Sequence, residues 1–222
     1  MPVVSNLPDQ PFGTPRRWGV FVAGVACLLT GISLAITAEL GVGSWQVFET
    51  GLVEATGLGF GVVVLGEALA ALALAWFWLG ERPWIATLVL AFGGVFIGVL
   101  LDVLSTPDLL AARIALLGVG AALIAVGVAF YLAADLGPSA QDALFVGIYR
   151  RYEVRPAVVR FALDGSLVVG GVLLRGQPGA GTVAMTVLVP ALIEPALRIG
   201  HRLADTPVPA ALARTARIAE LT

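Results

Sequence analysis

Two acidic residues stand in the middle of long apolar runs, where a charge is hardest to accommodate. Glu67 lies near the centre of the run from Gly59 to Leu79, and Asp164 lies near the centre of the run from Pro156 to Leu174. A charged side chain at the centre of a bilayer costs about 2.5–3.5 kcal/mol on insertion scales, and less when it is protonated. Both residues are therefore candidates for a proton or cation site, or for contact with a polar substrate.

A structural role is the alternative for each carboxyl group, which is then protonated and hydrogen-bonded to a neighbouring helix. For Asp164 this alternative has a named partner, because Arg160 lies four residues earlier on the same helical face. Glu67 has no such partner on its own run.

Two similar breaks interrupt the apolar pattern, ELGVGSWQ from Glu39 and DLGPSAQD from Asp135. Each follows a long apolar run, makes a Gly-containing turn and opens a short helical segment, with Ser44 or Ser139 placed to cap it. A helix N-terminus attracts anions. The breaks therefore add four candidate substrate-binding or ion-binding residues, which are Ser44, Trp45, Gln46 and Asp142.

The short segments after the breaks, Trp45 to Ala55 and Gln141 to Arg151, have two interpretations. Each is either a re-entrant hairpin that dips into the membrane or a connecting helix that lies on its surface. The sequence is compatible with both.

Further candidates lie in the later runs. Glu194 stands between Pro190 and Pro195 in the last run, and Thr87 and Thr182 each end a Pro-x-x-x-Thr loop before the last run of a half. Gly94 and Gly98 form a GxxxG pattern, which favours contact between helices and allows a homo-oligomer through these two residues.

Enzyme, cofactor and nucleic-acid functions find no support in the residues. The single histidine, His201, follows the last apolar run, so neither a His-based triad nor an HExxH metal pair can form inside the membrane. No cofactor motif is present, and the net charge of −2 indicates no nucleic-acid partner. We expect a protein that is not an enzyme.

The composition indicates an integral membrane protein. Apolar residues make up 59% of the 222 residues, charged residues 13%, and the mean hydropathy is +0.96. A span needs about 20 apolar residues, and six runs have that length. The predicted spans are Trp18 to Ala38, Gly59 to Leu79, Trp84 to Leu101, Ile114 to Ala134, Pro156 to Leu174 and Ala180 to Leu197.

The arginines predict the orientation in a plasma membrane. With the N-terminus inside, eleven of the thirteen basic residues fall on the cytoplasmic side, and only Arg113 and Arg175 fall outside. Both termini are therefore expected in the cytoplasm. Trp45 is expected on the outer side, opposite the other four tryptophans.

An internal repeat appears when the chain is aligned with itself at an offset of 96 residues. The aligned pairs include Arg17 with Arg113, Gly24 with Gly120, Gly31 with Gly127 and Gly41 with Gly137. Halves of three spans each can share a fold only if the second is inserted upside down, which is a common construction of secondary transporters. The fold class is therefore all-α, with six transmembrane helices in two inverted three-helix repeats and a short helical or re-entrant segment after the first span of each half.

These motifs resemble those of the YczE/YyaS/YitT-type bacterial integral membrane proteins. The resemblance rests on LGVGSWQVFETGLVEATGLGFG and PGAGT, and it covers about residues 17–199. Where that family usually has Pro-Trp-Asp, this chain has Ser44-Trp45-Gln46, and its second half keeps Asp142 after Ala140. The loop at Trp84 to Thr87 reads WIAT where the family has Gly-Ile-Gly-Thr. The resemblance implies an architecture rather than a biochemical activity.

The chain is predicted to be a transporter or permease for a small polar solute, with the lipid bilayer and a solute or proton as its partners. The alternative is a non-transporting membrane partner that supports another complex. The expected organisation is a disordered tail at 1–15, repeats at 16–104 and 109–199, and a cytoplasmic tail at 200–222.

Overall fold

The computed structural model describes residues 13–82, 84–153 and 156–207, and all regular structure in this part of the chain is helical. The expected all-α class is confirmed. The helices are α1 (Pro15–Thr37), α2 (Ser44–Thr56), α3 (Phe60–Ala73), the π-helix η1 (Leu74–Trp78), α4 (Ile85–Val103), α5 (Leu110–Ala134), α6 (Ala140–Tyr152), α7 (Pro156–Leu173) and α8 (Ala180–Ala204).

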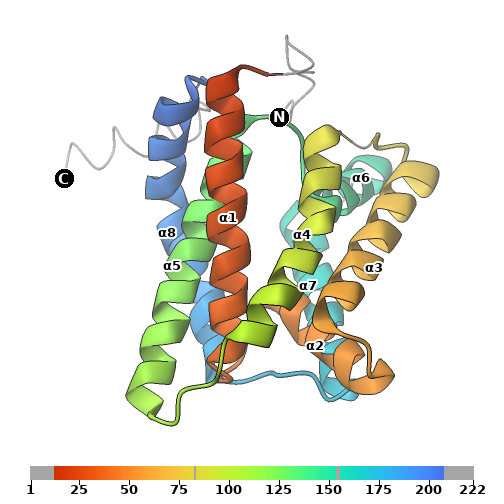
Figure 1. Cartoon of the computed structure of the whole chain (residues 1–222). Coiled ribbons are helices and arrows are strands. Elements are labelled where there is room, and N and C mark those ends of the chain that lie inside the picture. Colours follow the sequence, from red (N-terminus) through yellow and green to blue (C-terminus); the bar gives the residue numbers. More distant parts are fainter. Residues whose placement is uncertain (1–12, 83, 154–155, 208–222) are drawn as a thin grey trace, which may run out of the picture.

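The long helices run up and down through the molecule, and the two short ones lie at opposite ends (Figure 1). The short helix α2 lies toward one end beside α7, and α6 lies toward the other end beside α3 (Figure 1). The beginning of α1 and the end of α8 share one end, where Arg16 contacts Asp205 and the carbonyl of Arg202. The first and last helices therefore place both ends of the described chain on the same side.

Five of the described helices are long and apolar enough to cross a membrane. They are α1, α3 continued by η1, α4, α5 and α8. Large apolar side chains on the outside support this assignment, since Phe77 is 80% exposed and Val183 on α8 is 69% exposed. Lipid rather than water is the solvent that such a surface requires. The helix α7 forms where the fifth span was predicted, but it is not among these five.

The first break ends its helix through a left-handed backbone. Glu39 has φ of 50°, and Gly41 follows at φ of 105°, a value that glycine adopts without strain. The second break repeats the arrangement at Asp135 and Gly137, with φ of 53° and 127°.

Only one of the two expected serine caps forms. Ser139 caps α6 and accepts a hydrogen bond from the backbone N–H of Asp142. The N-cap of α2 is Gly43 instead, and Ser44 is already the first helical residue. Its hydroxyl donates to a different helix, as described below, so the prediction that Ser44 caps α2 was wrong.

Glycines allow α1 and α5 to pack backbone against backbone. A Cβ atom added at Gly24 would lie 3.0 Å from the carbonyl oxygen of Gly127, and one added at Gly31 would lie 2.7 Å from the carbonyl oxygen of Gly120. All four glycines belong to the aligned pairs of the repeat. In a membrane, where apolar burial gives little driving force, such close approach is a main source of helix association.

The GxxxG face of α4 packs within the chain. A Cβ at Gly94 would lie 2.8 Å from the Cβ of Val64, and a Cβ at Gly98 would lie 3.2 Å from Gly61, both on α3. This face is therefore covered by α3 and is not free for a second copy, contrary to the homo-oligomer contact expected at Gly94 and Gly98.

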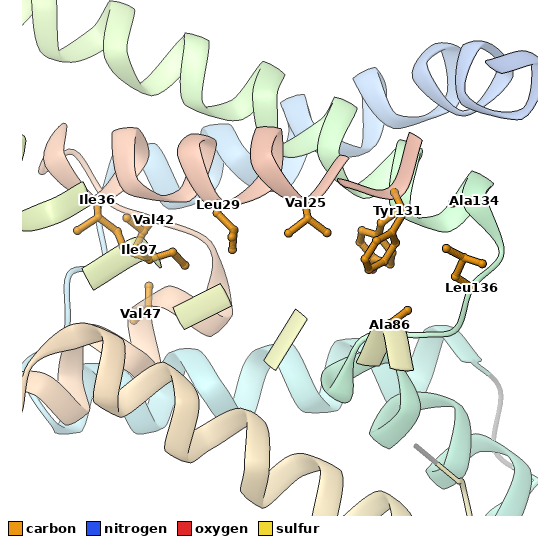
Figure 2. Close-up of a cluster of buried hydrophobic side chains, with 11 residues drawn as sticks. Val25, Leu29, Ile36, Val42, Val47, Ala86, Ile97, Tyr131, Ala134 and Leu136 are labelled. Carbon is orange, nitrogen blue, oxygen red and sulfur yellow. The ribbon is translucent and has the colours of Figure 1, made fainter. Parts of the chain in front are cut away.

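The largest buried cluster lies where α1, α4, α5 and the two breaks meet (Figure 2). Val25, Leu29 and Ile36 project from one side of α1 toward this cluster (Figure 2). Val42 and Val47 join it from the first break and α2, and both are fully buried. This cluster fixes the position of the first break against α4.

The ends of the helices differ in part from the expected boundaries. Helix α8 continues to Ala204, so residues 200–204 are helical rather than part of a tail. Helix α3 ends in the π-helix η1, which the sequence analysis did not anticipate. Most of the tails expected at 1–15 and 200–222 lies outside the described residues.

Candidate functional site

The two mid-run carboxylates each meet the beginning of a short helix. Ser44, the first residue of α2, donates a hydrogen bond to Oδ1 of Asp164 at 3.0 Å. Gln141, the second residue of α6, lies with its Nε2 atom 3.4 Å from Oε2 of Glu67. Because Asp164 and Glu67 stand near the middle of α7 and α3, the short helices begin well inside the molecule.

Asp164 has a second partner, which the sequence analysis expected. Nε of Arg160 lies 2.9 Å from Oδ2 of Asp164, one helical turn away on α7. The carboxylate side chain is 31% exposed, and its two oxygens are used by Arg160 and Ser44. Asp164 therefore sits in an ion pair with Arg160 at the N-terminal end of α2.

Glu67 has a partner that the sequence analysis missed. Glu49, in the second turn of α2, is only 2% exposed, and its carboxyl group lies close to the Glu67 carboxyl where α2 packs on α3. Oε2 of Glu49 and Oε1 of Glu67 are buried without a hydrogen-bond partner. Two carboxyl groups in contact, with an amide at their edge, form a potential proton-binding or cation-binding pair.

A sequence signal for Glu49 existed. If the segment after the first break enters the membrane, Glu49 carries the same energetic penalty that singled out Glu67. Glu49 lies between the first two of the six long runs, in a segment that was not predicted to be a full span. Glu54, which lies on the same short helix, is exposed.

Asp142 lies in a separate polar cluster at the start of α6. Its Oδ2 accepts hydrogen bonds from the hydroxyl groups of Tyr131 on α5 and Ser139. Tyr131 is almost completely buried. Asp142 therefore joins α6 to α5, and Tyr131 is a further polar residue that the sequence analysis did not identify.

The two threonines cap the last helix of each half. Oγ1 of Thr87 accepts from the backbone N–H of Trp84 and donates to the carbonyl of Pro138 in the second break, at 2.8 Å. Oγ1 of Thr182 accepts from the N–H of Gly179 at 3.2 Å. These contacts place both threonines at loops rather than beside the carboxylates.

The other candidate residues lie in different places. Trp45 packs against a buried cluster that includes Ala68 of α3 and Ala140 of α6. Its ring is thus partly buried between helices, and its expected position on the outer side of the membrane stays a prediction. Gln46 is in the first turn of α2 and turns its side-chain oxygen toward Gly43. Glu194 pairs with Arg198 on α8 at 2.8 Å.

The two pockets described for this structure are apolar grooves. One lies between α6 and α7, has a volume of about 380 Å³ and includes Ile148, Tyr152 and Ser166. The other lies between α1 and α4 and includes Phe21, Leu29 and Phe96. Neither is lined by Glu67 or Asp164. Among the described residues, no group of three or more His, Cys, Asp or Glu side chains could hold a metal ion.

Comparisons with known proteins agree with a membrane protein. An uncharacterized protein of Haemophilus influenzae is 29% identical over 212 residues, which covers 92% of this chain and 97% of the relative. The uncharacterized membrane protein YczE of Bacillus subtilis is 28% identical over 178 residues, which covers 78% of this chain and 81% of YczE. No solved structure matches the chain. Together with the apolar helices, these relatives identify a multi-pass integral membrane protein.

The family comparison covers the same region. The model of a family of unknown function, DUF6198, matches residues 15–196, which include both breaks, Glu49, Glu67 and Asp164. The chain therefore belongs to the DUF6198 family, in agreement with its YczE-type motifs.

Proposed function

We propose that this protein transports a small polar solute across the plasma membrane. The observation that carries the proposal is the meeting of two short-helix N-termini with two carboxylates halfway along α3 and α7. Interrupted helices whose N-termini face polar groups near the midplane are typical of secondary transporters. On this proposal α2 and α6 are re-entrant segments, and α7 is the sixth span.

Reciprocal contacts support two inverted repeats. Gly41 in the first break packs against Gly179, and a Cβ added there would lie 2.6 Å from the Gly179 backbone nitrogen. Gly137 in the second break packs in the same way against Trp84, at 2.6 Å. The break of each half thus receives the loop before the last helix of the other half. Such exchange is what a two-fold axis in the membrane plane produces.

The repeated pattern of an acid before Leu-Gly has a matching role in each half of the chain. Arg113 donates to the backbone carbonyls of Ala38 and Glu39, at 2.7 and 2.9 Å, and pairs with the Glu39 carboxylate. Arg17, its equivalent in the repeat, lies near Asp135. Partial burial raises the pKa of Asp135, and the charges of Arg17 and His201 oppose that rise. In both halves the acid closes one helix and an arginine from the other half lies beside it.

The two halves pack their last helices differently, which alternating access would require. Helix α4 packs on α3, whereas α8 packs on α5, and contact between α7 and α8 is marginal at most in the described part of the chain. If the halves exchange these arrangements, α4 leaves α3 while α8 closes on α7. Rocking of this kind around a fixed central site would open the site to alternate sides.

The orientation follows from the arginine distribution, with both termini in the cytoplasm. The contact between Arg16 and Asp205 supports the placement of both ends on one side.

Transport is tested with purified protein in liposomes that enclose a pH-sensitive dye. Panels of amino acids, small carboxylic acids and polyols are added outside, and solute-dependent, saturable proton or solute flux is measured. We expect flux with at least one panel, and its loss in Glu67→Gln at unchanged protein level. Asp164→Asn should reduce it less, because Arg160 then keeps a neutral hydrogen-bond acceptor beside it. Folded wild-type protein without flux for any panel would favour the non-transporting membrane partner.

A further inference from the structure

We propose that Glu49 and Glu67 together bind one exchangeable proton, as a carboxyl–carboxylate pair between α2 and α3. Glu49 is 2% exposed, and its Oε2 atom has no hydrogen-bond partner. Oε1 of Glu67 is also buried without a partner. An unpaired buried carboxylate is costly, so the pair is stable only when a proton lies between its two members.

The shared proton follows from like-charge repulsion. Two carboxylates in contact cannot both be ionised, whereas one protonated member donates a hydrogen bond to the other. The amide of Gln141 approaches Oε2 of Glu67 at 3.4 Å and supplies a further donor to the ionised member. Gln141 carries no charge, so it stabilises the pair without neutralising it.

The described charged side chains on the surrounding helices have other partners or lie at a helix end. On α7, Arg160 pairs with Asp164, which Ser44 binds from a different face of α2. On α6, Asp142 accepts from Tyr131 and Ser139, and Arg151 donates to the carbonyl of Trp78. On α4, the one charged residue is Asp102 in its last turn. Among the described side chains of these helices, none of the arginines named here pairs with Glu49 or Glu67.

Because Glu49 and Glu67 lie on different helices, the proton that they bind affects how these helices pack. Glu49 is on the short helix that begins at the first break, and Glu67 is on the long helix that follows it. Protonation holds α2 against α3, and full ionisation would push the two helices apart. This last step rests on the proposed transport function and assigns the proton to it as the coupling ion. The binding of the proton itself does not.

Difference infrared spectroscopy of the full chain in lipid nanodiscs tests the pair directly. The C=O stretching band of protonated carboxyl groups is recorded from acid to alkaline buffer for wild type, Glu49→Gln, Glu67→Gln and the double variant. Glu54→Gln is the matched control, since Glu54 lies on the same helix and is exposed.

We expect a wild-type band that persists at neutral pH and is unchanged in Glu54→Gln. Each single variant should lose the whole band, because a glutamine amide replaces the proton as donor and leaves its partner ionised. Loss of about half of the band in each single variant would mean two independent carboxylic acids and would overturn the proposal. Absence of the band in wild type, or its removal by added sodium or potassium, would overturn it as well.

These readouts are independent of transport. A normal carboxyl band with no solute flux would reject the transport function and leave the proton site in place. Solute flux without the carboxyl band would reject the proton site and support the transport function.

Discussion

The contact between α1 and α5 can be tested by adding one methyl group at Gly127. A Cβ atom built there lies 2.5 Å from the backbone nitrogen of Leu28, 2.7 Å from its Cα and 2.7 Å from the carbonyl oxygen of Gly24. Ordinary contact begins at about 3.4 Å, so the helices must separate by several tenths of an ångström or more. All three neighbours are main-chain atoms, which cannot move aside by a rotamer change.

The cost is that of overpacking, about 1–3 kcal/mol. Gly127→Ala also gains helix propensity of up to about 1 kcal/mol, which hides part of this cost. Gly118→Ala on the same helix is the matched control, since a Cβ at Gly118 has no neighbour within 4 Å. Both variants share the propensity gain, so the difference between them isolates the packing cost.

Thermal unfolding of purified protein in a mild detergent provides the assay, followed by circular dichroism. For a chain of this size 1 kcal/mol corresponds to roughly 2–4 °C in Tm. We therefore expect Gly127→Ala to unfold about 2–12 °C below Gly118→Ala, which itself should match or exceed wild type. Equal Tm values for the two alanine variants would show that α1 and α5 do not pack through Gly127.

Three further predictions follow from the breaks and the polar clusters. Gly137→Ala should be less stable than Gly57→Ala when unfolding is compared in the same detergent, because both glycines have positive φ but only Gly137 also contacts Trp84. The left-handed strain alone costs about 1–2 kcal/mol. A smaller loss of stability at Gly137 than at Gly57 would contradict the packing of the second break. Tyr131→Phe should lower the free energy of unfolding by about 1.5–3 kcal/mol, because Asp142 loses a buried hydrogen-bond donor. Tyr152→Phe, at an exposed site, should change it little. Equal stabilities of the two variants would exclude a stabilising Tyr131–Asp142 hydrogen bond. In a Cys27→Ala background, Leu58→Cys should react with a membrane-impermeant maleimide on intact cells and Asp205→Cys only after permeabilisation, and the opposite pattern would invert the proposed orientation.

Apolar run length determined where the long helices form, because lipid offers no partner for the backbone and a run of about 20 apolar residues must satisfy itself as a helix. The positions of both breaks were equally predictable, since an acid, a leucine and a glycine in a left-handed turn end a helix by local geometry. The glycines of the repeat marked close contacts by their lack of a side chain. In each case the cause is local in the chain.

Which surfaces meet was decided only by the tertiary structure. The GxxxG of α4 looked as suitable for a second copy as for another helix, and it packs on Gly61 and Val64 of α3. Tryptophan is a residue type typical of membrane interfaces, yet α2 places Trp45 against Ala68 and Ala140.

In the carboxyl pair, one residue was identifiable from the sequence and the other only from the tertiary structure. Sequence alone identified Glu67, because the energetic penalty of a carboxyl group in an apolar run depends only on its neighbours along the chain. Glu49 became part of the same site only when α2 folded back beside α3. A contact between residues on separate helices depends on the relative placement of those helices. That placement is fixed by packing over the whole assembly rather than by any local pattern.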